Sequence, residues 1–271
     1  MASTFWLALL VRASASALVV VAPTVAAESA GPFWGGLIVS LPIGAGPAYV
    51  MLALQHDAAF IAASALGSFA VNAATFVFLA ALALLAPAVR WGWALAGGLL
   101  AWAGAAMLIR QVEWDAASAC VLNLGVIVLS LWLTRSVPRG TGGTTRGAVR
   151  RRWYELPARA AMVGLVVGGV VTGSRALGPE LTGMAAVFPV AFTSFSLLVL
   201  PRLGGAAAAA IMASALRAMP GFGLALLTLH LAAVPLGVTA ALFAALGASL
   251  AWSLVLMAER HVSFEVSRLY R

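Results

Sequence analysis

Charge is scarce in this sequence, and lysine is missing from it. Charged residues make up 9% of the 271 positions and hydrophobic residues 63%, whereas soluble domains carry about 25% charged and 45–50% apolar residues. This imbalance excludes an ordinary water-soluble fold. The apolar residues form long runs, which predicts an all-α polytopic membrane protein, because a helix satisfies its own backbone hydrogen bonds in lipid.

Residue types that build reactive centres are also few. A single cysteine, Cys120, excludes an intramolecular disulfide and a cysteine-based zinc site, and three scattered histidines do not predict a metal site. Motifs for phosphate binding, Ser-His-Asp catalysis, zinc proteolysis and intramembrane aspartyl proteolysis are missing too. We therefore expect no catalytic residue, no cofactor and no metal, although a membrane enzyme acting on a lipid-linked substrate stays an alternative.

Nine apolar runs are long enough to cross about 30 Å of hydrocarbon at roughly 20 residues each. They lie near residues 5–27, 32–54, 58–86, 91–109, 115–134, 158–177, 181–201, 204–231 and 235–257. The first run also resembles a secretory signal peptide, because VAPTVAAESA is similar to a small-residue cleavage site. Its arginine, Arg12, lies within the apolar run and not before it, which favours a true span.

Arginines predict how these spans are oriented. The hydrophilic segment 135–157 carries six arginines, and the positive-inside rule places such a loop in the cytoplasm. With nine spans the amino terminus then lies outside and the tail, 259–271, lies inside. The arginine and alanine bias indicates a bacterial inner membrane. The net charge of +8 therefore needs no nucleic-acid partner, and anionic membrane lipid is the other partner that the basic loop can bind.

The two halves of the sequence resemble each other, which predicts an internal duplication. At an offset of 147 residues the aligned pairs are Arg12 and Arg159, Gly31-Pro32 and Gly178-Pro179, Gly36 and Gly183, and Pro42 and Pro189. After a shift of three more residues, IAASAL from Ile61 matches IMASAL from Ile211.

The duplication predicts a division of the chain. We expect a first four-helix repeat (1–110), a linker span (111–134), the basic loop (135–157), a second four-helix repeat (158–258) and the tail. One linker span between the repeats inverts the second relative to the first, a construction that recurs in secondary transporters.

Short stretches and the overall plan resemble two known kinds of membrane protein. GGLIVSLPI at 35–43 and TGMAAVFPV at 182–190 are similar to a stretch of the small GlpM-type membrane proteins. The plan of four, one and four helices resembles that of drug/metabolite transporters. This second resemblance implies transport and gives a modest preference for export, and neither resemblance implies any functional residue.

Two spans contain residues that interrupt helices. The second span contains Pro42, Gly44 and Gly46, and the seventh contains Pro189 at the corresponding position, followed by Thr193 and Ser194, whose hydroxyls can bind freed carbonyls. Interrupted spans at corresponding positions of two repeats point to a substrate site. The structural alternative is that these prolines only bend helices for packing.

Charged residues within spans give further candidates, since each is costly in a membrane. Arg217 lies near the centre of the eighth span, and its repeat counterpart, Gly67, lies close to Asn72. We expect Arg217 and Asn72 to bind a carboxylate or phosphate, with capping of broken helices as the alternative. Arg12 is a further candidate anion ligand.

A second charged pair is a candidate gate. Glu28 aligns with Arg175 in the repeat register, so opposite charges occupy symmetric helix ends. Alternating gates are one interpretation of this exchange, and exposed loop charges are the other.

These observations favour a secondary transporter of a small anionic or zwitterionic organic solute. The alternative class is a nonenzymatic accessory or assembly subunit that uses small-residue faces such as GGAAAAA at 204–210 to bind a partner. Self-association into a homo-oligomer is compatible with both.

Overall fold

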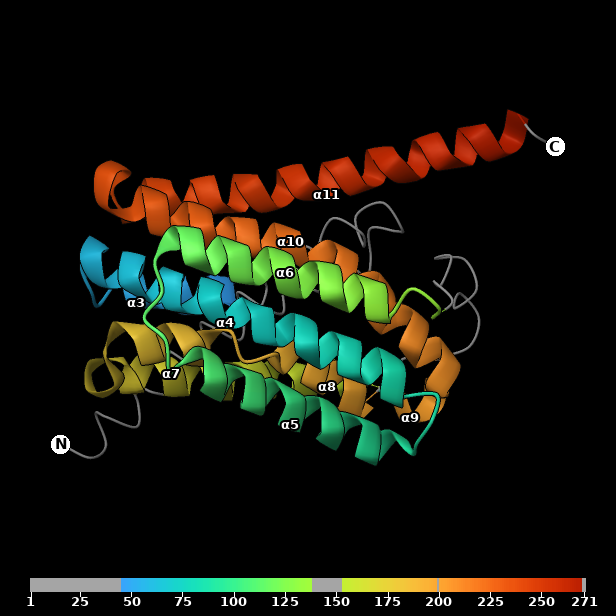
Figure 1. Ribbon diagram of the computed structural model, residues 1–271. Coiled ribbons are helices and arrows are strands. Elements are labelled where there is room, and N and C mark those ends of the chain that lie inside the picture. Colours follow the sequence, from blue (N-terminus) through green and yellow to red (C-terminus); the bar gives the residue numbers. More distant parts are fainter. Residues whose placement is uncertain (1–44, 138–152, 199, 270–271) are drawn as a thin grey trace.

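The structure is a computed structural model that describes residues 45–137, 153–198 and 200–269, and helices dominate all three ranges (Figure 1). In chain order the helices are α3 (Ala45–Ala53), α4 (Ala58–Leu85), α5 (Trp91–Ile109), α6 (Ala116–Leu133), α7 (Glu155–Ala186), α8 (Val190–Leu198), α9 (Leu200–Leu203), α10 (Gly205–Leu236) and α11 (Val238–Leu269). No strand occurs in these ranges, and the predicted all-helical class is confirmed.

Six helices in the described ranges are long and apolar enough to cross a membrane: α4, α5, α6, α7, α10 and α11. Their number and composition are consistent with a multi-pass membrane protein. The count of nine spans is not confirmed. The first predicted span lies outside the described residues, and so does the part of the second span that precedes Ala45. The helix α7 covers both the sixth predicted span and the start of the seventh.

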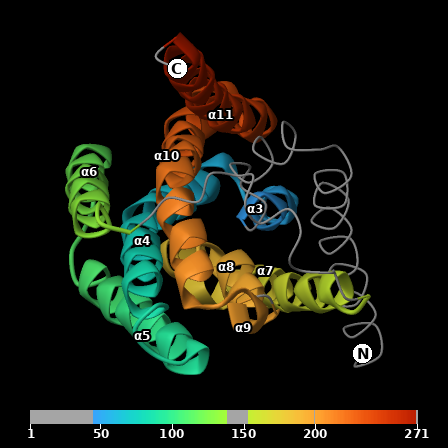
Figure 2. The same ribbon diagram turned by 90° about the vertical axis from the view of Figure 1, so that its right-hand side faces the viewer.

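The helix α4 lies at the centre of the bundle, in contact with α5, α6, α7 and α10 (Figure 2). Its most apolar stretch is 78% buried, against 17% in α6 and 22% in α5. In a membrane the outer helices therefore present apolar faces to lipid, while α4 is surrounded by protein. A polar side chain on α4 has only other helices as neighbours.

The closest neighbour of α4 is α10, which runs antiparallel to it. At one end of the pair, a Cβ at Gly205 would lie 2.1 Å from the carbonyl oxygen of Ala86. At the other end, His230 Nδ1 lies 2.8 Å from the carbonyl oxygen of Ala62. Contacting residue numbers thus rise along α4 as they fall along α10. Glycine at position 205 permits the close approach, because any side chain there would overlap the α4 backbone.

The predicted seventh span is broken. Gly178 in α7 has φ 73° and ψ 174°, a left-handed conformation that glycine adopts without strain, and the chain changes direction there. The helix resumes at Pro179 and ends at Ala186. After the residues 187–189, α8 begins at Val190. Proline 189 cannot donate the backbone hydrogen bond that a continuous helix needs, so the interruption falls where the sequence predicts it.

Two aspartates cap the N-termini of helices. Asp57 accepts a hydrogen bond from the Phe60 backbone N–H at 2.8 Å. Asp115 forms a capping box with Ser118 at the start of α6, and the Ser118 side chain is the main cause that lowers the pKa of this carboxyl group. These acidic residues therefore satisfy free N–H groups at helix starts.

Candidate functional site

Four polar side chains lie on one face of α4: Ser64, Ser68, Asn72 and Thr75. Their spacing of four, four and three residues places them on successive turns of the same face. Each is at most 2% exposed. We call this set the α4 polar stripe. Buried polar groups in a membrane helix are expensive and usually functional, which makes the stripe the leading candidate site.

The first half of the stripe contacts α3 and α7. The hydroxyl groups of Tyr49 and Ser68 lie 2.6 Å apart, and Ser68 donates a hydrogen bond to the carbonyl oxygen of Gly183 at 2.6 Å. A Cβ at Gly183 would lie 1.9 Å from the carbonyl oxygen of Ser64. The backbone of α7 therefore rests directly on α4, next to the broken span.

The second half of the stripe contacts α6 and α10. Asn72 Nδ2 donates to Asn123 Oδ1 at 3.2 Å. Asn123 Nδ2 in turn donates to the carbonyl oxygens of Phe69 and Ala119 at 2.8 and 2.9 Å. On the α10 side, a Cβ at Gly223 would lie 3.1 Å from Asn72 Nδ2. Asn72 thus links three helices near their middle.

Several polar atoms of the stripe have no hydrogen-bond partner among the described residues: Ser64 Oγ, Asn72 Oδ1 and Thr75 Oγ1. Other buried or half-buried hydroxyl groups of the bundle avoid this state by donating to a carbonyl oxygen one turn earlier in the chain. Thr134, for example, donates to the carbonyl oxygen of Ser130 at 2.7 Å, and Ser214 donates to that of Ala210 at 2.8 Å. An unpaired buried polar group costs about 1–3 kcal/mol, so the stripe carries hydrogen-bonding capacity that the closed bundle does not use.

The helix α8, which follows the break, carries similar groups. Thr193 Oγ1 and Ser196 Oγ have no partner in the described part of the chain, while Ser194 donates to the carbonyl oxygen of Ala191 at 2.9 Å. All three residues are buried. Phe192 and Phe195 of the same helix pack against a hydrophobic cluster that the second half of α4 forms with parts of α5 and α10. The helix that follows the break therefore shares a cluster with the helix that carries the stripe.

An aromatic contact covers the break itself. The ring of Phe188, between α7 and α8, packs edge-on against Trp102 of α5, with centroids 5.3 Å apart. The indole N–H of Trp102 is buried and has no acceptor among the described residues. This N–H is a further unused donor beside the irregular backbone.

Arg217, the leading sequence candidate, lies elsewhere. Its side chain is exposed on α10, whereas Asn72 is 1% exposed inside the bundle. The structure therefore does not bring Arg217 and Asn72 into one site. On the outward side of α10, the Trp252 indole donates to the backbone carbonyl of Arg217 at 3.1 Å. This carbonyl lies one turn before Pro220 and Gly221, two residue types that disfavour a regular helix.

The other sequence candidates are spread over the chain. Pro42, Gly44, Arg12 and Glu28 lie outside the described residues. Gly46 occupies the first turn of α3. The Arg159 guanidinium lies 5.5 Å from the centre of the Phe195 ring, so the counterpart of Arg12 contacts α8.

Arg175 is exposed on α7 and lies near a histidine. His56 Nε2 is 2.7 Å from Ser174 Oγ, which itself donates to the carbonyl of Val171. The ring of His56 stacks on Phe60 with centroids 3.7 Å apart. Burial lowers the pKa of His56, and the positive charge of Arg175 lowers it further. The proposed gate partner of Arg175, Glu28, is not described.

Sequence reasoning overlooked an ion pair that joins α7 to α9. The Arg202 guanidinium contacts the Glu155 carboxylate, and Glu155 is 6% exposed. Arg202 also donates to the carbonyl oxygen of Leu198 at the end of α8, from Nη2 at 2.7 Å and from Nε at 3.2 Å. This arginine therefore caps the helix that follows the break and fixes it to the start of α7.

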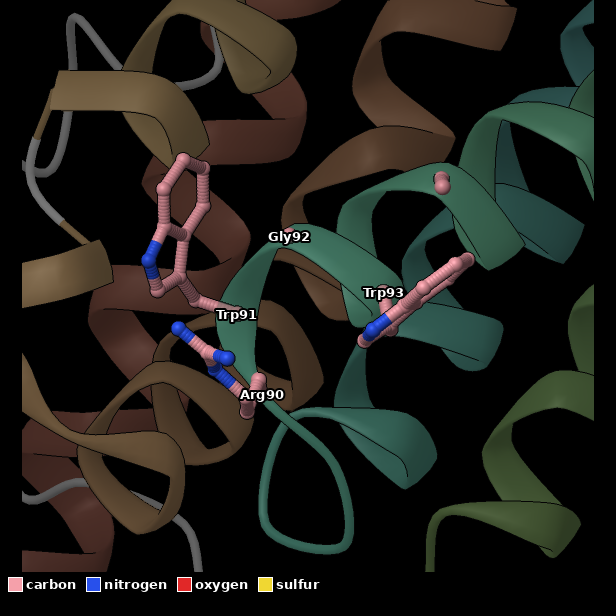
Figure 3. Close-up of a pocket in the computed structure, with 5 residues that line it drawn as sticks. Arg90, Trp91, Gly92 and Trp93 are labelled. Carbon is pink, nitrogen blue, oxygen red and sulfur yellow. The ribbon is translucent and has the colours of Figure 1, made fainter.

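A shallow open pocket of about 320 Å³ lies at the start of α5, lined by Arg90, Trp91, Gly92, Trp93 and Ala96. Figure 3 shows the Trp91 and Trp93 rings on opposite sides of the start of α5, with the Arg90 side chain on the same side as Trp91. Exposed tryptophan beside arginine is typical of a helix end at the membrane surface. None of the residues that line this pocket belongs to the stripe.

No group of His, Cys, Asp and Glu that could hold a metal ion occurs within the described ranges. No protein family model, curated protein or solved structure matches this chain. The comparisons therefore neither strengthen nor weaken the two resemblances noted in the sequence. Functional inference has to rest on the geometry of the stripe and of the broken span.

Proposed function

We propose that this protein is a secondary transporter of a small polar organic solute, which it binds between the α4 polar stripe and the broken span formed by α7 and α8. The observation that supports this proposal most directly is a set of buried polar atoms without a hydrogen-bond partner on one face of the central helix: Ser64 Oγ, Asn72 Oδ1 and Thr75 Oγ1. A passing solute that pairs with these atoms would recover the hydrogen-bond energy they lack.

An inverted-repeat architecture is part of the proposal, and several helix contacts support it. In the repeat register α3 corresponds to α8, α4 to α10, and α5 to α11. The helix α8 begins directly after Pro189, and the corresponding proline, Pro42, precedes α3 in the sequence. The packing of α4 on α5 has its equivalent in α10 on α11. The packing of α3 on α11 has its equivalent in α8 on α5.

The antiparallel pair of α4 and α10 lies where the axis relating the two repeats would pass. Ile61 corresponds to Ile211, so Val71 corresponds to Gly221. The neighbouring residues Asn72 and Gly223 are in contact. The unpartnered amide oxygen of Asn72 therefore lies close to the point that both repeats share, where a midplane substrate site of an inverted-repeat transporter is expected.

The accessory-subunit alternative keeps only part of its motivation. In the segment GGAAAAA at 204–210, Ala208 and Ala209 are at most 2% exposed and Gly205 contacts the end of α4. Gly204 and Ala206 are exposed, so only part of this small-residue face is open to a partner protein.

We place the protein in a bacterial inner membrane with the amino terminus outside and the basic loop inside. Reporter fusions after residues 56 and 145 test this arrangement. The inverted-repeat proposal expects the two fusions to report opposite sides of the membrane. Reporters on the same side would refute the arrangement.

Transport itself is tested with the purified protein in proteoliposomes. A labelled mixture of small polar metabolites is offered outside, and the solutes that enter are identified by mass spectrometry. We expect at least one solute to enter faster than into empty liposomes, and Asn72→Leu to abolish the difference. Ser214→Ala is the matched control, because the Ser214 hydroxyl donates within its own helix. Entry equal to that of empty liposomes for every solute would refute the function.

A further inference from the structure

The hydrogen-bond geometry around Asn72 carries information about the class of solute. An amide side chain presents a donor on its nitrogen and an acceptor on its oxygen, and the two ends are assigned from their surroundings. The assignment at Asn72 follows from its neighbour. Asn123 Nδ2 lies 2.8 and 2.9 Å from two backbone carbonyl oxygens, those of Phe69 and Ala119. Carbonyl oxygens accept only, so the atom that faces them must be the nitrogen.

The orientation of Asn123 then determines that of Asn72. With its nitrogen on the two carbonyls, Asn123 presents its oxygen to α4. Asn72 must therefore turn its amide nitrogen toward this oxygen, and Asn72 Nδ2 donates to Asn123 Oδ1 at 3.2 Å. The free end of Asn72 is consequently its oxygen, an acceptor, and it is this atom that has no partner among the described residues. The side chain is 1% exposed, so bulk water does not satisfy it.

A second unpartnered atom lies one turn away. Thr75 is three residues after Asn72, and residues with this spacing are neighbours on a helix surface. Thr75 Oγ1 is buried and has no partner in the described structure. Its hydroxyl group accepts a hydrogen bond as readily as it donates one. The two unpartnered atoms therefore comprise one that can only accept, Asn72 Oδ1, and one that can accept or donate, Thr75 Oγ1.

On this basis we propose that Asn72 and Thr75 form an acceptor subsite that selects solutes through N–H groups, such as an amide, ammonium or amidinium group. This inference rests on the proposed transport function and names its substrate class. A carboxylate has no hydrogen to give to Asn72 Oδ1, so this buried acceptor would stay unpartnered and would face the negative charge of the ligand. The anionic preference expected from Arg217 is thereby replaced, since Arg217 lies outside the stripe.

Three planar compounds of equal size test the selection: acetamidinium, acetamide and acetate. They differ in the number of N–H groups, which falls from four to two to none, and in charge, which falls from positive to neutral to negative. The Asn72 and Asn123 variants described below separate the two effects, because neither substitution changes a charge. Each is titrated against the purified protein in nanodiscs, and binding is followed by the rise in thermal stability that a ligand for the folded state produces. We expect acetamide and acetamidinium to bind at least about tenfold more tightly than acetate, the ratio that one net hydrogen bond supports.

Two variants separate a binding role from a structural one. Asn72→Leu removes the acceptor and should abolish the preference. Asn123→Ala leaves Asn72 in place but removes the partner that fixes its orientation, so that Asn72 can rotate its nitrogen toward the ligand. We expect this variant to bind acetate and acetamide within about threefold of each other, because the selectivity depends on one oriented hydrogen bond. Thr134→Val, which alters a hydroxyl paired within α6, should keep the native preference.

Three results would overturn the inference: acetate binding as tightly as acetamide, an unchanged preference in Asn123→Ala, or no binding of any of the three compounds up to about 100 mM, far above the millimolar range of weak ligands. The proposed function is judged separately by the proteoliposome assay. Transport of a carboxylate that depends on Asn72 would keep the transporter and remove only this substrate class.

Discussion

Replacing Gly183 by alanine should force α7 away from α4. The new Cβ would lie 1.9 Å from the carbonyl oxygen of Ser64 and 2.8 Å from its carbonyl carbon, so the two backbones must separate by about 1.5 Å before ordinary van der Waals contact is restored. The separation also stretches the hydrogen bond from Ser68 to Gly183, which is 2.6 Å long. Overpacking and the lost hydrogen bond together should cost about 2–4 kcal/mol.

The same helix provides a matched control. A Cβ at Gly169 would meet nothing within 4 Å, and alanine in a helix restricts the unfolded chain, which stabilises by about 0.4–1 kcal/mol. Thermal unfolding in one detergent should therefore give opposite shifts, a fall of about 4–16 °C for Gly183→Ala and a small rise for Gly169→Ala. Equal shifts for the two variants would refute the close contact between α4 and α7.

Three further predictions concern the stripe, the ion pair and the histidine. Thr75→Val should raise the melting temperature, because it removes an unpaired hydroxyl group whose burial costs about 1–3 kcal/mol, and it should slow transport. Thr134→Val should do neither. A melting temperature that falls in Thr75→Val contradicts this prediction. Glu155→Gln should destabilise the protein by about 2–4 kcal/mol, because it removes the carboxylate that the half-buried Arg202 guanidinium contacts. Glu155→Gln with Arg202→Gln should recover part of the loss in a double-mutant cycle. The pKa of His56 is lowered in the folded state, so as the pH falls the unfolded chain takes up the proton first. The contribution of His56 to stability should therefore be fully present above about pH 7 and decline as the pH falls through about 6.5. The same decline in His56→Gln would show that another group is responsible.

Hydrophobic runs and proline were the most informative sequence signals. The all-helical class follows from the lengths of apolar runs, and the interruption at Pro189 follows from the missing backbone donor. The number of spans does not follow as simply. The first predicted span and most of the second lie outside the described residues, and within α7 Gly178, with φ 73°, separates two helical segments at the boundary predicted between the sixth and seventh spans.

Arg217 shows where reasoning from cost alone fails. The insertion cost of a charge depends on depth in the membrane, but depth does not say which face of a helix a residue occupies. Because α10 is apolar nearly all round, its sequence does not indicate which face is buried. The serine, asparagine and threonine spacing in α4 was readable, since positions 64, 68, 72 and 75 share a helix face. Its partner Asn123 was not, because only packing brings α6 to the middle of α4.

The wide sequence separation of the contacts made by α4 has a consequence for synthesis. Ser68 and Gly183 are 115 residues apart, so at about 5–20 residues per second the ribosome needs on the order of 10 s to supply the partner. During that interval the polar face of α4 has left the ribosome without α7 or α10. Its early partners are α3, with Tyr49, which is already made, and α6, with Asn123, which follows soon after. The newly made first half must therefore wait in the insertion machinery or against α6, and chains truncated before Gly183 should be degraded rapidly.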